Sequence, residues 1–423
     1  MRANDFLNTL GAATHRSQGA DSVSQIVSAL SYSGIRNIRD DGTDNSGTWS
    51  DFCSIHGATG ADVTLIATHD NPINLSQYDA LAACGAITQV EGPNEPNNFP
   101  FSWNGENCGS ATSSTWVGCA DFQRSLYAAV KADPKLAGVK VLDLTEPGAE
   151  TDDQGLQFLT VPSGMGTIQA AGTKYADIAN LHNYVEGNGS CGSLNDNQAW
   201  GAEDPNNQPG VGCWDGMTGE YLYQTWNKHF TASSLSTGPS DPKETTETGW
   251  QTASSYTGRY ITQDQQGKLL VNLYLSAAAR GWLRTYVYQL MDDGQGTWGM
   301  FTESGSSATP KLSGTYIHNL TSVLSDATSN FTPTPIAYSV GGETSTIHDL
   351  LLQKSDGTYE LEVWGDRPVS GTVTAVTVTL PTNYPTINVY DVTSGTTPVR
   401  TLSNTGSVPL TITDHAFVVE FGG

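Results

Sequence analysis

Short apolar segments alternate with longer amphipathic ones through residues 1–325, and this alternation limits the fold more than any other feature of the sequence. Such alternation is typical of parallel strands that are connected by helices. Helical periodicity is clear at 22–32, 121–131, 269–282 and 312–324. The predicted strands are 6–13, 35–40, 63–68, 87–91, 139–144, 178–182, 244–247 and 285–290. The sequence therefore predicts an α/β fold in which residues 1–325 form a catalytic TIM (β/α)8 barrel.

The pattern changes after residue 325, where helical periodicity gives way to Thr/Val alternation with frequent turn residues. Alternation with period two is typical of antiparallel strands that bury one face. The strands predicted here are 347–353, 359–364, 373–380, 387–392 and 416–421. We therefore expect residues 326–423 to form a small all-β sandwich domain. Whether a strand from elsewhere in the chain joins this domain is left open.

Charge excludes several classes of partner. The 423 residues include 19 basic and 43 acidic ones, which gives a net charge of −24. This charge disfavours binding to nucleic acid and to anionic membranes, so an uncharged polymer suits the chain better. The acidic run at 40–45 lacks the closing glutamate of a calcium loop, and we expect no metal and no cofactor. The number of protomers is left open.

The cysteines point to an oxidising compartment. Six are present, and four of them lie in stretches rich in Gly, Asn and Ser. We predict three disulfides, with free buried thiols as the alternative. No leader-like segment precedes the first strand, which we interpret as a mature secreted chain, extracellular or periplasmic. The predicted pairs are Cys108 with Cys119, Cys191 with Cys213, and Cys53 with Cys84.

Two predicted strands end in carboxylates. The fourth runs into ITQVEGPNEPNN at 87–98 and delivers Glu95, and the seventh lies in KETTETGWQ at 243–251 and delivers Glu247. Cleavage of a glycosidic bond with retention requires such a pair, one as acid/base and one as nucleophile. Two carboxylates that face each other in such a site repel each other as anions. We therefore expect one of them, Glu95, to hold a proton. Strand alternation would turn Glu244 to the opposite face, and Glu244 is the reserve candidate for the nucleophile.

Several other residues follow predicted strands at the same edge of the barrel. Arg39, at the end of the second strand, could keep the nucleophile ionised or could pair with Asp40 or Asp41. His182 and Tyr184 follow the sixth strand and could line the site or only the barrel rim. His15 and His69, after the first and third strands, are weaker candidates.

Tryptophans supply flat apolar surfaces on which sugar rings stack. Trp298, after the eighth strand, and Trp250, just beyond Glu247, are the candidates for this role. The alternative for any one of them is that it fills the core, which we prefer for Trp282.

These features together resemble the clan A retaining glycoside hydrolases, with families 39, 30 and 5 as the nearest. The resemblance depends on Asn94-Glu95-Pro96 in the fourth strand segment, on Glu247 before Gly249-Trp250 in the seventh, and on the C-terminal β domain. It implies an O-glycosyl hydrolase that cleaves β-glycosidic bonds of a neutral oligo- or polysaccharide by double displacement. It assigns the acid/base to Glu95 and the nucleophile to Glu247.

The resemblance also implies roles for two neighbours of these carboxylates. Asn94 would hold the 2-hydroxyl of the sugar, and Tyr184 would donate a hydrogen bond to the nucleophile. Two alternatives remain open, a non-catalytic carbohydrate-binding barrel and a polysaccharide lyase. The presence of both carboxylates argues against the first. No cluster of Lys and Arg is evident that would neutralise a uronate, which argues against the second.

Overall fold

A computed structural model describes residues 1–96, 98–109, 116–145, 156, 158–161, 163–164, 168–182, 242–255, 260–294, 296–328, 330–342, 347–365 and 373–423. Three residues with predicted roles, Tyr184, Cys191 and Cys213, lie outside these ranges. Their predictions stay untested.

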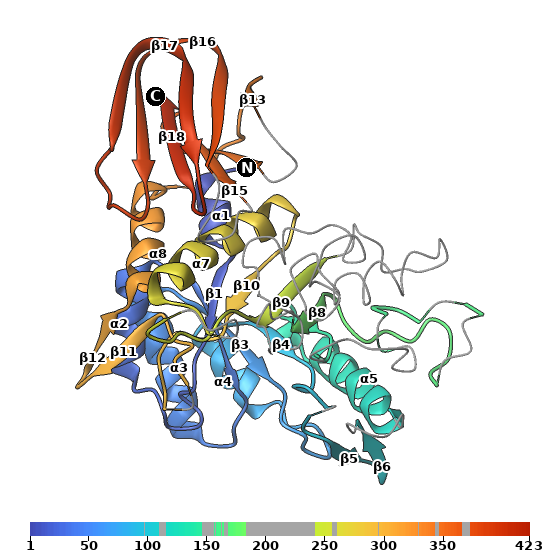
Figure 1. Cartoon of the computed structure of the whole chain (residues 1–423). Coiled ribbons are helices and arrows are strands. Elements are labelled where there is room, and N and C mark those ends of the chain that lie inside the picture. Colours follow the sequence, from blue (N-terminus) through green and yellow to red (C-terminus); the bar gives the residue numbers. More distant parts are fainter. Residues whose placement is uncertain are drawn as a thin grey trace.

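Eight parallel strands, the first beginning at Leu10 and the last ending at Val287, build a barrel (Figure 1). Neighbours follow the order β7-β4-β3-β2-β1-β10-β9-β8. The two ends of this order meet where Leu142 bridges Ile178 in parallel and the Asp143 N–H donates to the Ile178 carbonyl at 3.0 Å. All eight predicted barrel strands are confirmed, at β1 Leu10–Ala13, β2 Asn37–Asp41, β3 Asp62–Ile66, β4 Ile87–Glu91, β7 Lys140–Leu142, β8 Ala179–His182, β9 Lys243–Thr248 and β10 Thr285–Val287.

Helices cover the outside of this barrel, and local sequence sets where they begin. α2 and α7 both begin with a capping box, made by Ser22 with Gln25 and by Thr262 with Gln265. No helix among the described residues is both long and apolar enough to cross a bilayer. The helices are α1 Ala3–Leu7, α2 Val23–Ser33, α3 Ser46–Thr59, α4 Ser76–Ala83, α5 Val117–Ala132, α7 Gln263–Ala279 and α8 Leu312–Val323, with a 3-10 turn at Pro134–Leu136.

The start of the first predicted strand is wrong. Residues 6–13 were expected to be one strand, but the chain forms α1 before β1 begins at Leu10. Ala3, Phe6 and Leu7 are the buried residues of α1, and their spacing of three and four is that of a helix face. Helical packing of these side chains therefore outweighs the short apolar run.

Two disulfides link segments that follow the barrel strands. Cys53 pairs with Cys84, which joins α3 to the end of α4, and Cys108 pairs with Cys119, which joins a short hairpin to α5. The hairpin consists of β5 Phe101–Trp103 and β6 Glu106–Cys108. Two of the three predicted disulfides are thus confirmed. A second hairpin, β11 Phe301–Ser304 and β12 Ser307–Pro310, precedes α8.

The C-terminal part is an all-β domain, as predicted, and it lies against α7 and α8 (Figure 1). Its strands form one antiparallel sheet, in which all six contribute side chains to a single core. The predicted strands 373–380 and 387–392 are one long strand, β16. The domain comprises β13 Ser339–Gly341, β14 Ile347–Gln353, β15 Thr358–Gly365, β16 Thr374–Asp391, β17 Arg400–Ile412 and β18 Phe417–Gly422.

Strand β17 was not predicted from the sequence. It contains Gly406 and Pro409, residues that weaken a strand pattern. Pro409 is tolerated because β17 pairs only with β16 and is an edge strand.

The domain is joined to the barrel by shared core packing and by the N-terminus. Leu352, Trp364 and Val418 are buried in the same hydrophobic cluster as the barrel and its helices. The N-terminal amine of Met1 donates to the Leu351 carbonyl at 3.2 Å, and Arg2 bridges Gln353 in parallel. The start of the chain therefore touches the β14 edge through one isolated bridge, while the sheet itself, in the described part of the chain, contains only β13–β18.

Candidate active site

A cavity of about 700 Å³ opens where the barrel strands end. This volume lies in the range of small-molecule sites, and the carboxyl ends of the strands are where barrel enzymes place their chemistry. The cavity is lined by five of the predicted site residues, Arg39, Asn94, Glu95, Glu247 and Trp298.

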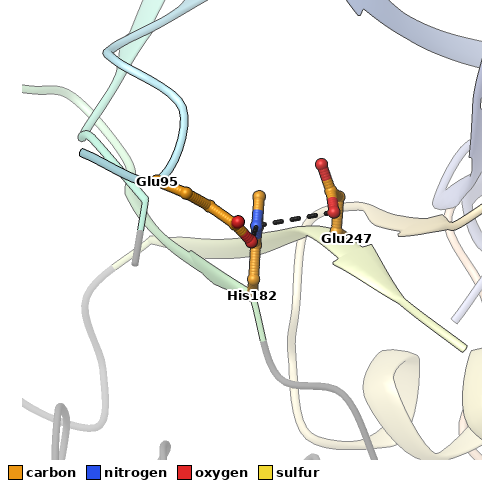
Figure 2. A group of neighbouring side chains, drawn as sticks. All are labelled: Glu95, His182 and Glu247. Carbon is orange, nitrogen blue, oxygen red and sulfur yellow. Dashed lines mark hydrogen bonds and ion pairs between the residues drawn. The ribbon is translucent and has the colours of Figure 1, made fainter. Parts of the chain in front are cut away.

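Glu95, His182 and Glu247 meet at this edge although they are far apart in the sequence (Figure 2). His182 Nδ1 lies 2.6 Å from Glu95 Oε1 and 3.6 Å from Glu247 Oε2. One oxygen of each carboxylate and one nitrogen of the imidazole all lie within 4.8 Å of one another. The His182 side chain is fully buried, and its Nε2 lies 3.1 Å from Thr246 Oγ1. The imidazole is thus held between the two carboxylates, and the three groups could also bind one metal ion.

Arg39 is the buried cation of the site. Its Nε and Nη2 donate to both oxygens of Glu91 at 2.6 and 2.7 Å, and its Nη1 donates to Glu247 Oε1 at 2.6 Å. Burial alone would disfavour the guanidinium, but the two carboxylates outweigh it and hold the pKa of Arg39 well above its ordinary value. Of the two sequence-based interpretations, the structure shows the contact with Glu247. Asp40 instead accepts hydrogen bonds from Thr14 and from the Arg16 N–H.

Asn94 is oriented by the same cation. Its side-chain oxygen accepts a hydrogen bond from Arg39 Nη2 at 2.6 Å, and its backbone bridges Thr145 in parallel. Because the amide oxygen is occupied, the amide nitrogen is the group that is left to donate toward the cavity.

A β-bulge turns Glu247 into the site. His182 pairs with Glu247 although Leu181 pairs with Thr245, and on the other side Val287 pairs with Thr248 although Thr285 pairs with Thr245. Both neighbouring strands therefore skip one residue of β9 at the same place. The extra residue breaks the alternation of the strand, as bulges next to active sites commonly do.

The prediction that Glu244 faces away from the barrel interior is consequently wrong. Gln89 Nε2 donates to Glu244 Oε1 at 2.6 Å inside the barrel, where Glu244 is 1% exposed. Burial raises the pKa of Glu244 to about 7. Glu244 does not line the cavity, so it is not placed to act as the nucleophile.

The backbone of Glu95 is unusual. Its φ is 43°, in the left-handed region that non-glycine residues seldom adopt. The N–H groups of Asn98 and Phe99 both donate to the Glu95 carbonyl at 2.8 Å, and Asn98 Nδ2 donates to Glu95 Oε2 at 3.0 Å. A conformation of this kind costs on the order of 1–3 kcal/mol and persists where the surroundings enforce it.

The two tryptophan candidates lie in different environments. Trp298 lines the cavity, and its carbonyl accepts a hydrogen bond from Gln266 at 2.9 Å. Trp250 is fully buried in the barrel core, with its carbonyl held by the same Gln266 at 2.8 Å. The prediction that Trp250 is a sugar platform is therefore corrected, because a fully buried ring presents no face to a ligand.

The sequence reasoning missed Asp293 and Tyr288 and ranked His15 low. His15 Nδ1 lies 2.5 Å from Asp293 Oδ2, and His15 and Tyr288 both line the cavity. Burial, and then the charges of Glu247 and Asp293, raise the pKa of Tyr288 well above its ordinary value. The eighth predicted strand already contained Tyr288, so its place near the strand end was the available signal. Asp293 carried no such signal, because it lies in the loop beyond that strand.

Comparison with known proteins locates the fold. No protein-family model and no curated protein matches the sequence. The structure is similar to a solved structure titled arabinofuranosidase, with a TM-score of 0.57, 10% identity and coverage of 98% of this chain and 97% of the other. It is also similar to the catalytic domain of GH30 xylanase C from Talaromyces cellulolyticus, with a TM-score of 0.54, 12% identity and coverage of 97% and 96%.

A third structure agrees with these two. The GH51 arabinofuranosidase from Xanthomonas axonopodis pv. citri matches with a TM-score of 0.52 and 12% identity, over 94% of this chain and 89% of the other. At such identity the likeness concerns the fold. The chain thus shares the arrangement of a barrel and a C-terminal β domain with glycoside hydrolases of families 30 and 51, and the resemblance to family 39 stays a prediction.

Proposed function

We propose that the protein is a retaining glycoside hydrolase, secreted, that cleaves a neutral oligo- or polysaccharide with Glu95 as acid/base and Glu247 as nucleophile. One observation carries the proposal: oxygens of the two carboxylates lie within 4.8 Å of each other at the mouth of the barrel. Retaining glycosidases place their carboxyl groups about 5–5.5 Å apart, whereas inverting ones leave about 6.5–9.5 Å for a water. The solved structures that share the fold are described as xylanases and arabinofuranosidases, which supports a glycan substrate.

The hydrogen bonds around the carboxylates fit two distinct roles. Glu247 Oε1 accepts a hydrogen bond from Arg39, which keeps the carboxylate ionised so that it can attack the anomeric carbon. Glu95 gives a proton to the glycosidic oxygen as that bond breaks, which leaves a covalent glycosyl ester on Glu247. Glu95 then takes a proton from a water that attacks the ester, and Glu247 is released.

His182 and Asn98 hold Glu95 in position through its two oxygens. Asn94 donates its free amide N–H to the 2-hydroxyl of the sugar. Residues 1–325 would be the catalytic domain, and residues 326–423 would brace it. We expect no metal in the reaction, because proton transfer and nucleophilic attack use the same three groups that a metal would occupy.

The proposal is tested with aryl β-xylosides, β-glucosides and β-galactosides, aryl α-arabinofuranosides, and neutral polysaccharides such as xylan. The wild type should cleave at least one of them, with and without EDTA. Glu247→Ala should lose turnover, and added azide should restore it by forming a glycosyl azide of inverted configuration. Glu244→Gln is the matched control, since it alters a carboxyl group of the same strand. If Glu247→Ala retains wild-type activity, the assignment of the nucleophile is wrong.

A further inference from the structure

We propose that His15, held by the buried Asp293, forms a hydroxyl-binding wall for the glycone, the sugar whose anomeric carbon reacts, on the side of the cavity away from Glu95. This inference rests on the proposed glycosidase function and adds a specificity-determining pair to it. The ligand group is a hydroxyl other than the 2-hydroxyl, which Asn94 already serves in the proposed mechanism.

The pair is built as a binding group. His15 follows β1 and lines the cavity, and its side chain is 11% exposed. Asp293 follows β10 and its side chain is fully buried, with Oδ2 at 2.5 Å from His15 Nδ1. The His15 N–H also donates to Asp21 Oδ2 at 2.8 Å, and its ring meets Tyr288 edge to face at 5.4 Å between centroids. Asp293 and Tyr288 therefore fix the imidazole, and the hydrogen bond to Asp21 fixes the backbone that carries it.

The fixed ring leaves one nitrogen for a ligand. Asp293 holds Nδ1, so the second ring nitrogen, Nε2, is the one that can meet another group. Among the described residues, no hydrogen bond reaches Nε2. A hydroxyl can both donate and accept, so it matches Nε2 in either protonation state of the ring.

Barrel topology gives this wall its place relative to the reaction. In the strand order, β4 precedes Glu95, β1 precedes His15 and β10 precedes Asp293, and β1 and β10 lie three and four positions from β4 in a barrel of eight. His15 and Asp293 therefore lie across the mouth from Glu95. Because Glu95 protonates the leaving group, the leaving group lies on the Glu95 side of the cavity. The wall across the mouth therefore faces the glycone.

The two sides also differ in chemistry. Next to Glu95 and Asn94, the cavity lining also includes Phe99, which is 62% exposed and has no polar side-chain atom. Hydrogen-bonding side chains, His15 and Gln18, lie on the β1 side. Such a site would discriminate between glycones by their hydroxyl groups. It would accept varied leaving groups, because an apolar ring stacks without requiring a particular hydroxyl.

The alternative is that the pair only ties the loop after β10 to the loop after β1. A brace and a binding group differ in one measurable way. Loss of a brace weakens turnover of every substrate to a similar degree. Loss of a binding group removes the penalty for deleting one hydroxyl of the sugar and leaves the other penalties in place.

The test is a cycle between protein and substrate. Take the aryl glycoside that the wild type cleaves best and its monodeoxy analogues, and measure kcat/KM for the wild type, His15→Ala, His15→Gln and Asp293→Asn. We expect the wild type to lose about 10- to 100-fold on one analogue other than the 2-deoxy sugar. The kcat/KM of His15→Ala on the parent glycoside should be lower than that of the wild type by a similar factor. Between the parent glycoside and that analogue, the kcat/KM of His15→Ala should then fall by less than about threefold. His56→Ala, which lies outside the cavity, should keep the wild-type pattern.

The outcomes separate the pair from the function. If the wild type cleaves the parent and every foldable variant shows the wild-type set of penalties, the pair is a brace and the glycosidase proposal stands. If the wild type cleaves no glycoside, the proposed function fails and this inference fails with it. Should His15→Ala not fold, His15→Gln and Asp293→Asn decide by the same criterion.

Discussion

The barrel mouth and the contact between the barrel and the β domain both bury carboxylates, but they treat the charge in opposite ways. At the mouth, Glu91 and Glu247 share the guanidinium of Arg39. At the domain contact, Glu360 and Glu362 lie on the β15 face that also carries Trp364, and both are fully buried. Lys354 approaches Glu360 at 2.5 Å. Within the described part of the chain, no hydrogen bond reaches either oxygen of Glu362.

The difference shows in the pKa values. Burial raises the pKa of Glu360 to about 8 and that of Glu362 well above its ordinary value. Keeping a buried carboxylate charged requires a buried partner cation, which is costly to desolvate. The protein supplies that cation where the proposed nucleophile needs its charge. At the domain contact, no ion pair of a described residue reaches Glu362, where burial favours the protonated carboxyl group. The predictions below test this contrast in order of expected effect.

The largest effect is expected at Arg39. Arg39→Met leaves two carboxylates buried without their cation, so the free energy of unfolding should fall by about 3–5 kcal/mol. On the proposed mechanism, kcat/KM should fall at least about 10³-fold, since the nucleophile loses the group that keeps it ionised and oriented. Urea unfolding and kinetics on the best substrate measure the two effects.

Arg284→Met is the matched control for Arg39. Arg284 is largely buried beside β9, with Nη2 at 2.9 Å from Asp62 and no place in the cavity lining. It should destabilise the protein while leaving kcat/KM within about threefold, because it removes no group from the reacting atoms. Equal losses of kcat/KM in the two variants would mean that Arg39 acts only through stability.

The second effect concerns the pH dependence of stability. Glu362 has a pKa that is higher in the folded protein than in the unfolded chain, so the folded state binds more protons above about pH 4.5. Its contribution to stability is therefore greatest at low pH and is lost as pH rises toward the folded pKa, by at most about 1.4 kcal/mol per pH unit. Glu362→Gln should flatten the fall of the thermal unfolding midpoint between pH 5 and 8 and raise that midpoint at pH 8.

Glu106→Gln, at an exposed position in β6, is the control and should leave the pH dependence unchanged. An unaltered slope in Glu362→Gln would show that Glu362 is charged in the folded protein. The two regions would then treat buried carboxylates alike.

Much of this architecture was accessible from the sequence. The eight barrel strands and four C-terminal strands, β14, β15, β16 and β18, follow from apolar periodicity, which depends on which face of each segment is buried. The meeting of Glu95, Arg39 and Glu247 also follows, since the carboxyl ends of parallel strands converge on one edge of a barrel. Local pattern and topology together were sufficient for these residues.

Other features depend on contacts that no local pattern reports. The bulge in β9 adds one residue against both neighbouring strands, so period-two reasoning gave the wrong face for Glu244. Trp250 is apolar in either role, and only packing against the core decides that it is buried. His15 and Asp293 are 278 positions apart in the sequence. Their contact follows from barrel closure, which places β1 beside β10.

The third effect is expected at Lys311, whose side chain is 3% exposed. Its ammonium donates to the Thr297 carbonyl and to Thr252 Oγ1, both at 3.1 Å, and lies 3.2 Å from Asp292. These contacts hold the loop that carries Trp298. On the prediction that Trp298 is a stacking platform for the sugar, Lys311→Met should raise KM about tenfold with a smaller change in kcat, because displacing the ring weakens binding of ground and transition states alike. A drop in kcat with KM unchanged would contradict this role.

The smallest effect is expected at an ion pair between the barrel and the β domain. Lys268 on α7 lies 3.1 Å from Asp414, between β17 and β18, and 2.9 Å from Asp264. Burial would raise the pKa of Asp414, but the hydrogen bond from His415 and the charge of Lys268 outweigh it and lower that pKa to about 2. The Lys268 side chain is 17% exposed, so solvent screens the pair and Lys268→Met should cost only about 1 kcal/mol.

Because neither Lys268 nor its partners Asp264 and Asp414 line the cavity, kcat/KM of Lys268→Met should stay at the wild-type value. Thermal unfolding and steady-state kinetics on one preparation measure both quantities. A change in kcat/KM beyond about threefold, in protein that remains folded at the assay temperature, would mean that the domain contact and the mouth are coupled. The buried charges at the barrel mouth and at the domain contact could then no longer be treated as independent of each other.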